Sequence, residues 1–160
     1  MPFSTSPSTT RPSEAAAVQT PGQPLERLPG WEARLAAVLA AARAQAFGWG
    51  QHDCFLFAAE DVQALTGHDV AAPWRGRYRT QRGALRHIAA YGGTFTGAFT
   101  RLFGAEPVPV AQARRGDVAD LVRAGVHHLG VVSGAHVAFL GEQGIIMVPR
   151  SQTLQVWRIG

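Results

Sequence analysis

The sequence predicts an α+β fold, in which a helical N-terminal half packs on a small antiparallel sheet. Residues 31–103 hold several alanine-rich or amphipathic stretches that end at glycines, as helices do. Residues 118–159 hold short runs of Val, Ile, Leu and aromatic residues separated by glycines, as strands are. The spacings between these runs leave no room for crossover helices, so we expect an antiparallel meander.

Length and composition describe one globular domain. The chain has 160 residues, 46% of them hydrophobic, which is enough for a core without covalent staples. Residues 1–24 are rich in Ser, Thr, Pro and Ala without periodicity and predict a disordered or extended tail. Residues 25–160 are expected to form the domain. No apolar run approaches the ~20 residues of a membrane span.

Four helices are expected. Alanine and leucine content, capping residues and terminal glycines support each of them. They are Trp31–Phe47, Cys54–Leu65, a helix capped by Thr80 that runs to Tyr91, and Thr94–Phe103. The stretch Glu106–Ala113 carries two prolines and does not continue a helix.

Five strands are expected after this stretch. They are Val118–Val122, His128–Val132, His136–Leu140, Gly144–Val148 and Leu154–Ile159. Successive side chains of a strand point to opposite faces, so the neighbours His127 and His128 cannot both face the helices.

The net charge of +4 is modest, and its 15 basic residues are all arginine. The densest group lies between Arg75 and Arg86 and is either a patch for a polyanion or a solvated face. No nucleic-acid motif accompanies it, so we expect no nucleic-acid partner.

The stretch around Cys54, the single cysteine, carries the strongest chemical signal. Asp53 is a good N-cap residue, which makes Cys54 the first residue of a helix. Helix-start amides and the helix dipole lower a cysteine pKa, so the pattern indicates a nucleophilic thiolate. Alternatively, Cys54 is one more small buried apolar residue.

A thiolate nucleophile needs a base, usually a histidine, and a group that orients this histidine. His52 precedes Cys54 in a loop, while His68 and His87 look like ordinary surface residues. The strand region holds His127, His128 and His136, where we expect the partner. A zinc site of Cys54 and two histidines is conceivable, but a fourth ligand and regular ligand spacing are missing. We therefore expect neither a metal nor a cofactor.

The order of motifs resembles the NlpC family of papain-like cell-wall cysteine peptidases. An Asp-Cys pair (Asp53-Cys54) opens a helix, Arg-Gly-Asp-Val (Arg115–Val118) enters a sheet, and His-Leu-Gly-Val-Val (His128–Val132) forms the next strand. The resemblance implies a papain-like, NlpC-like fold with Cys54 as nucleophile and His128 as base.

The resemblance also assigns supporting roles. The third catalytic residue of this family usually comes from the strand after the base, where His136 or Gln143 are the candidates. Asp53 either positions oxyanion donors or simply caps the helix, and the Cys54 amide is itself an oxyanion donor. Trp74, in its loop, is either packing or part of a groove for substrate.

A second resemblance is to small proteins coded in phage tail and prophage gene clusters. Its motifs are Trp-x-x-x-Asp-Cys (Trp49–Cys54), Thr-Gly-x-Asp (Thr66–Asp69), Arg-Gly-x-Tyr (Arg75–Tyr78) and Trp-Arg-Ile (Trp157–Ile159). It implies a protein made in the bacterial cytoplasm and placed in a virion tail or phage-like particle. The N-terminus lacks the basic and apolar segments of a signal peptide, which fits delivery by a particle.

Two functions follow from these resemblances. The first is a phage-tail peptidoglycan peptidase that hydrolyses peptide-stem amide bonds through a Cys54 thioacyl intermediate. The second is a catalytically inactive structural or assembly protein of a tail tip. Phe55-Leu56 stand where the family has Ser-Gly after the cysteine, and this bulk favours the second function. Tail-tip or baseplate proteins are the expected partners, bound through residues 1–24.

Overall fold

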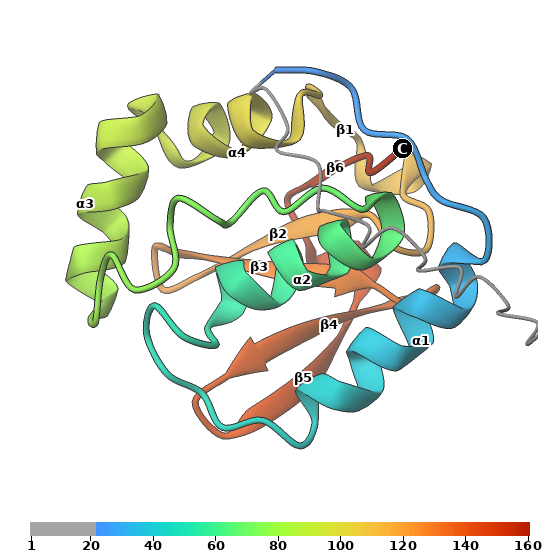
Figure 1. Ribbon diagram of the computed structural model, residues 1–160, viewed down its shortest axis with the longest axis horizontal. Coiled ribbons are helices and arrows are strands. Elements are labelled where there is room, and N and C mark those ends of the chain that lie inside the picture. The colour runs from blue at the N-terminus through green and yellow to red at the C-terminus, as the bar shows by residue number, and fades with distance from the viewer. Residues whose placement is uncertain (1–21) are drawn as a thin grey trace, which may run out of the picture.

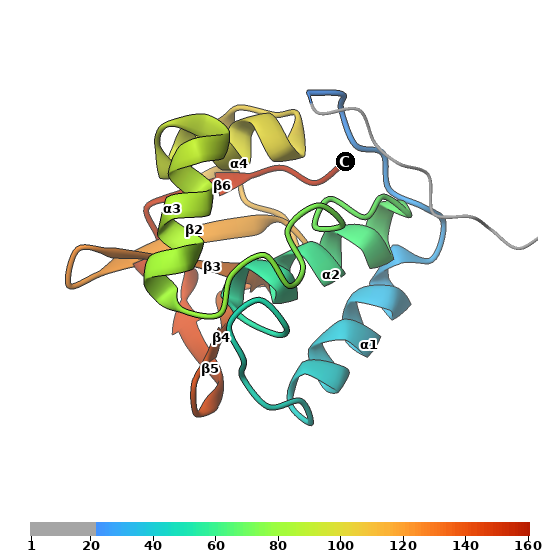
Figure 2. The ribbon, with the colours of Figure 1, turned by 60° about the vertical axis from the view of Figure 1, so that its left-hand side comes forward.

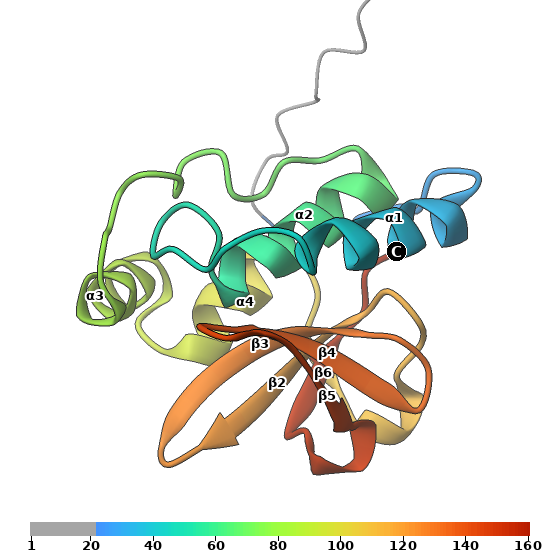
Figure 3. The same ribbon diagram turned by 90° about the horizontal axis from the view of Figure 1, so that it is seen from below.

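The structure is a computed structural model that describes residues 22–160. Most of the expected N-terminal tail, residues 1–21, lies outside the described residues. The described part confirms the α+β class. Its helices gather on one face of a six-stranded antiparallel sheet, as Figures 1 and 3 show.

The helices of the described residues begin and end close to the expected positions. They are α1 (Trp31–Ala42), α2 (Cys54–Thr66), α3 (Gln81–Gly92) and α4 (Phe95–Phe103). The hydroxyls of Thr80 and Thr94 cap α3 and α4, each by accepting from the amide three residues later. In Figures 1 and 2, α2 lies between α1 on one side and α3 on the other.

The sheet has the strand order β1-β6-β2-β3-β4-β5. Its strands are β1 (Pro107–Val108), β2 (Val118–Arg123), β3 (Val126–Val132), β4 (His136–Gly141), β5 (Gly144–Pro149) and β6 (Gln155–Trp157). The meander prediction is confirmed for β2 to β5, which pair in succession. It is wrong for the last strand, because β6 returns to pair with β2.

Several boundaries differ from the sequence prediction. The first helix ends at Ala42, and Phe47 instead packs its ring edge-on against Trp49 at 5.0 Å between ring centres. The strand β3 begins at Val126, so it includes His127. The segment after Glu106 contributes the short strand β1 and a 3₁₀ turn, Val110–Gln112, that sequence analysis did not predict.

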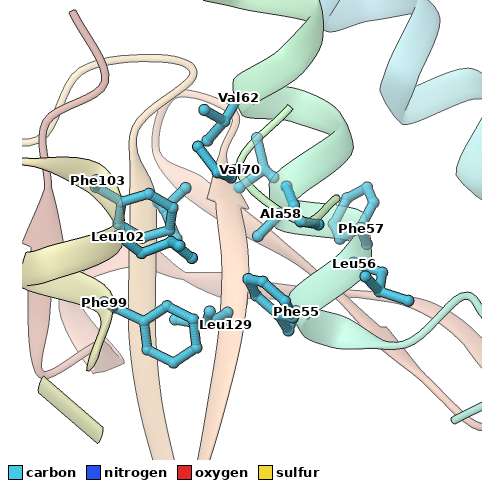
Figure 4. Packing of buried hydrophobic residues seen from close by; sticks show 14 of the residues in the cluster. Phe55, Leu56, Phe57, Ala58, Val62, Val70, Phe99, Leu102, Phe103 and Leu129 are labelled. Carbon is cyan, nitrogen blue, oxygen red and sulfur yellow. The ribbon is translucent and has the colours of Figure 1, made fainter. Parts of the chain in front are cut away.

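The two faces of the sheet have separate cores. The face that α2 and α4 cover contains the sheet residues Val118, Leu129, Val131, Ala138 and Leu140. Figure 4 shows Phe55, Phe99 and Leu129 meeting between α2, α4 and β3. The opposite face carries the alternate residues Ala119, Leu121, Val132, Val137, Phe139, Val148 and Val156. This alternation decides which strand side chains can reach α2.

The segment before α1 is fastened to distant parts of the chain by Arg27. Its guanidinium donates to the carbonyl oxygens of Ile159 (2.5 Å) and Arg115 (2.7 Å) and to Asp117 Oδ1 (2.9 Å). It also lies over the Trp31 ring, 4.3 Å from its centre. Figure 1 shows this segment running beside the C-terminal end. We call these contacts the Arg27 clasp.

Candidate active site

Asp53 caps α2 and also holds the loop in front of it. Its Oδ1 accepts from the Leu56 amide at 3.0 Å, and its Oδ2 accepts from the Gly50 amide and the Tyr78 hydroxyl, both at 2.9 Å. The residue is 1% exposed, so these donors replace water around a buried carboxylate. The capping prediction is therefore confirmed. With its oxygens already bonded in this way, Asp53 anchors the start of α2 and the loop that carries Tyr78.

Cys54 is the first residue of α2, as predicted, but its thiol is not activated at rest. Burial raises the pKa of Cys54 to about 11, and the negative charge of Asp53 raises it further. Hydrogen bonds from the amides of Leu129, Phe55 and Cys54 itself lower it, yet they do not outweigh the burial. The prediction of a lowered pKa is wrong, because the sequence could not show how deep the thiol lies.

The strand β3 places His127, and not His128, on the face that carries α2. Leu129 faces the helices and donates its amide to the Cys54 sulfur, and His127 lies two residues earlier on the same face. His128 is paired with Leu121, which belongs to the core of the other face. Burial and the charge of Arg123 lower the pKa of His128. We therefore correct the candidate base from His128 to His127.

His127 is held by a buried carboxylate from the neighbouring strand. Its Nδ1 lies 3.0 Å from both oxygens of Asp120 on β2. In the neutral ring this pairing places the proton on Nδ1, which leaves Nε2 as the proton acceptor. The ring also stacks on Phe95, with 4.3 Å between centres and 17° between planes. His127 is thus oriented from two sides, while 32% of its side chain stays exposed.

Asp120 is in turn oriented by Gln155 on β6. Gln155 Nε2 donates to Asp120 Oδ2 at 3.1 Å and to Thr96 Oγ1 at 2.8 Å. Burial raises the pKa of Asp120, while its hydrogen bond and charge interaction with His127 lower it. Three strands and α4 therefore contribute to one polar network inside the sheet face that α2 covers.

Cys54 and His127 border the same cavity, which has a volume of about 50 Å³. Its other walls come from the loop before α2, the start of α2, the helices α3 and α4, and the β2–β3 hairpin. These lining residues are Trp49, Asp53, Phe55, Trp74, Tyr78, Gln81, Ala84, Leu85, Ile88, Phe95, Phe99, Val126, His128 and Leu129. Cys54 as a residue keeps intermediate exposure, so the cavity opens to solvent.

The structure does not bring the other predicted residues into the site. His136 is exposed at the start of β4, beside the far end of β3, about 20 Å along the strand from His127. Gln143 is exposed in the turn between β4 and β5. Trp74 borders the cavity but is 1% exposed and packs on Phe55 and His87, so it is a core residue and not a surface groove.

Sequence reasoning missed Asp120, Gln155 and Tyr78. Asp120 had a usable signal, because strand alternation places it on the same face as Val118, two residues earlier. Gln155 gave none, because its role depends on the return of β6 to β2. Tyr78 was visible as the end of the Arg-Gly-x-Tyr motif, but its bond to Asp53 depends on the path of the loop after α2.

Within residues 22–160, no cluster of three or more His, Cys, Asp or Glu side chains is arranged to hold a metal ion. None of the helices in this part of the chain is long and apolar enough to cross a bilayer.

A family model described as a domain of unknown function, DUF6950, matches residues 26–159. The chain belongs to the DUF6950 family. No curated protein and no solved structure matches it. The match covers Cys54, His127, Asp120 and Gln155, so the candidate active site lies wholly inside the DUF6950 domain.

Proposed function

We propose that this DUF6950 domain is a cysteine hydrolase that cleaves an amide bond through a thioester on Cys54. The observation that carries the proposal is the His127–Asp120 pair, on the sheet face that Cys54 contacts and in the same cavity. A nucleophile, a base with a free Nε2 and a carboxylate that orients this base are the parts that acyl transfer requires.

The raised pKa of Cys54 favours one order of events. The thiol keeps its proton at rest, and His127 Nε2 accepts that proton as the sulfur attacks the carbonyl carbon. Asp120 stabilises the imidazolium that forms. The amides of Cys54 and Phe55 at the start of α2 are donors for the developing oxyanion.

The tetrahedral adduct then collapses with cleavage of the carbon–nitrogen bond. His127 gives its proton to the departing amine, and a thioester remains on Cys54. Water attacks the thioester carbonyl while His127 accepts the proton of this water. Cleavage of the carbon–sulfur bond releases the acid, and the proton returns to the Cys54 sulfur.

The resemblance to the NlpC family supports a papain-like classification and a peptide-stem amide of peptidoglycan as substrate. The second resemblance supports a setting in a phage tail or related particle, with tail-tip or baseplate proteins as partners. Both remain part of the proposal.

Digestion of purified peptidoglycan tests the proposal. The wild type should release new amino groups, and Cys54→Ala should release none. We expect His127→Ala to lower the rate by about 100-fold or more, since a general base contributes roughly that much. His128→Ala is the matched control and should keep most of the activity. Equal loss in both histidine variants, or none in either, would contradict the assignment of His127.

A second candidate function is a structural protein of the particle without turnover. The raised pKa of Cys54 and the small cavity favour it, together with Phe55, which fills part of the site. In this case Cys54→Ala should assemble into particles as well as the wild type does, and the wild type should not digest peptidoglycan. The digestion assay therefore decides between the two functions.

A further inference from the structure

The walls of the cavity beside Cys54 are mostly apolar. α2 and Trp74 contribute aromatic rings, α3 contributes Ala84, Leu85 and Ile88, and α4 contributes Phe95 and Phe99. Most of these side chains are buried, and Trp74 and Phe99 are 1% and 0% exposed. An apolar wall of this kind binds apolar groups and penalises polar ones, which would lose their water without gaining partners.

The charges around the cavity act in the same direction. Among the described residues that line it, none is an arginine, and the chain contains no lysine. Asp53 is the charged carboxylate on its wall, and its negative charge already raises the pKa of the Cys54 thiol. A carboxylate on a bound substrate would therefore meet the like charge of Asp53 and neither an arginine nor a lysine among the described lining residues.

The volume limits the size of the occupant. An engineered cavity of about 150 Å³ binds benzene, and one water takes about 30 Å³ of liquid. The cavity here has about 50 Å³, which suits a group of about one to three carbon atoms. Leu85, at the wall, is 47% exposed and marks the side that opens to solvent.

The positions of Cys54 and His127 indicate which part of a substrate occupies the cavity. The group on the attacked carbonyl carbon lies two bonds from the sulfur from the first tetrahedral adduct until the thioester is cleaved. The leaving amine must instead meet His127, on β3, to receive its proton. Phe95 of α4 stacks on His127, so the wall that α3 contributes is left for the acyl side.

We propose that this cavity selects the acyl group of the substrate, admitting a small uncharged apolar side chain, such as that of alanine, and rejecting a carboxylate. The inference rests on the proposed function, because it takes the occupant to be an acyl group. It extends that function by naming the chemistry next to the cleaved bond: an alanyl carbonyl is accepted and a glutamyl carbonyl is not.

Thiosulfonate reagents test the cavity without requiring turnover. The Cys54 sulfur attacks the sulfenyl sulfur of the reagent, a disulfide forms and a sulfinate leaves. Methyl, 2-sulfonatoethyl and benzyl methanethiosulfonate compare a small neutral, an anionic and a bulky group, with each rate divided by that for N-acetylcysteinamide. We expect the methyl reagent to be favoured at least tenfold over the anionic one. Equal normalised rates would overturn the inference.

Variants on α3 test whether this selectivity arises in the cavity. Ala84→Leu should fill the cavity and slow the methyl reagent at least tenfold, whereas Ala89→Leu, on an exposed position of the same helix, should not. Ile88→Ala should enlarge the cavity and speed the benzyl reagent relative to the methyl one. Unchanged ratios in Ala84→Leu and Ile88→Ala would also overturn the inference.

Hydrolysis is measured separately on the p-nitroanilides of N-acetylalanine and of N-acetylglutamate, the latter through its α-carbonyl. We expect the alanine substrate to have a kcat/KM at least tenfold higher. Faster hydrolysis of the glutamate substrate would overturn the inference. If neither is hydrolysed and peptidoglycan is not digested, the proposed function fails, and the labelling ratios alone still decide whether the cavity selects small uncharged groups.

Discussion

Asp61 offers a test of the structure that is independent of any function. It lies on α2, is fully buried, and neither of its carboxylate oxygens has a hydrogen-bond partner among the described residues. Burial raises its pKa well above the ordinary value of 3.8; the charge of Arg27 lowers it, and that of Asp117 raises it further. Replacing Asp61 with Asn keeps the shape and removes the titration.

The sign of the effect follows from proton binding. Between pH 3.8 and the raised pKa, the folded wild type holds a proton on Asp61 that the unfolded chain has lost. The raised pKa therefore makes its whole contribution to the free energy of unfolding below this window. This contribution falls as the pH rises through the window, by up to about 1.4 kcal/mol per pH unit. From pH 4.5 to pH 5.5, we expect Asp61→Asn to gain about 1.3 kcal/mol relative to the wild type.

Thermal and denaturant unfolding at these two pH values measure this gain. For a domain of this size, about 1.3 kcal/mol corresponds to a Tm difference of about 3–5 °C. Glu32→Gln, which removes an exposed carboxylate on α1, is the control and should not show the gain. A difference between wild type and Asp61→Asn that stays constant over the two pH values would refute the raised pKa of the buried Asp61.

Three further results are expected. Iodoacetamide should label Cys54 at a rate that keeps rising with pH toward its pKa of about 11, and an inflection at or below neutral pH would instead show a preformed ion pair. Tyr78→Phe removes a donor from the buried Asp53 and should lower the free energy of unfolding by about 1–3 kcal/mol in urea titration, whereas unchanged stability would mean that water replaces the hydroxyl. Gly116→Ala should cost about 1–3 kcal/mol in the same assay, because φ is +82° and the new Cβ would lie 2.5 Å from Leu65; an unaltered midpoint would contradict this close packing.

Much of the fold could be predicted because local signals agree with it. Asp53, Thr80 and Thr94 are side chains that cap helices in any context, and each begins a helix in the structure. The return of β6 to the far side of β2 could not be predicted. It depends on pairing between residues 35 to 39 positions apart, for which the chain carries no local signal.

The candidate site was predictable in its parts but not in its assembly. The helix-start position of Cys54 follows from capping, and alternation shows that one of His127 and His128 faces it. Whether His127 or His128 faces Cys54 depends on which face of the sheet Leu129 lies on. That face is decided by packing against the helices. The pKa of Cys54 could not be inferred, because the helix-start amides are visible in the sequence while the depth of burial is not.

The Arg27 clasp has a consequence for the order of folding. Its hydrogen bonds join residues that are 132, 88 and 90 positions apart, and contacts of such separation carry a large loop-closure entropy. The segment before α1 buries Leu25 but leaves residues 22–24 exposed, so few apolar contacts hold it. We therefore expect it to dock late, after β2 has formed, and to exchange its amide hydrogens faster than α2 does.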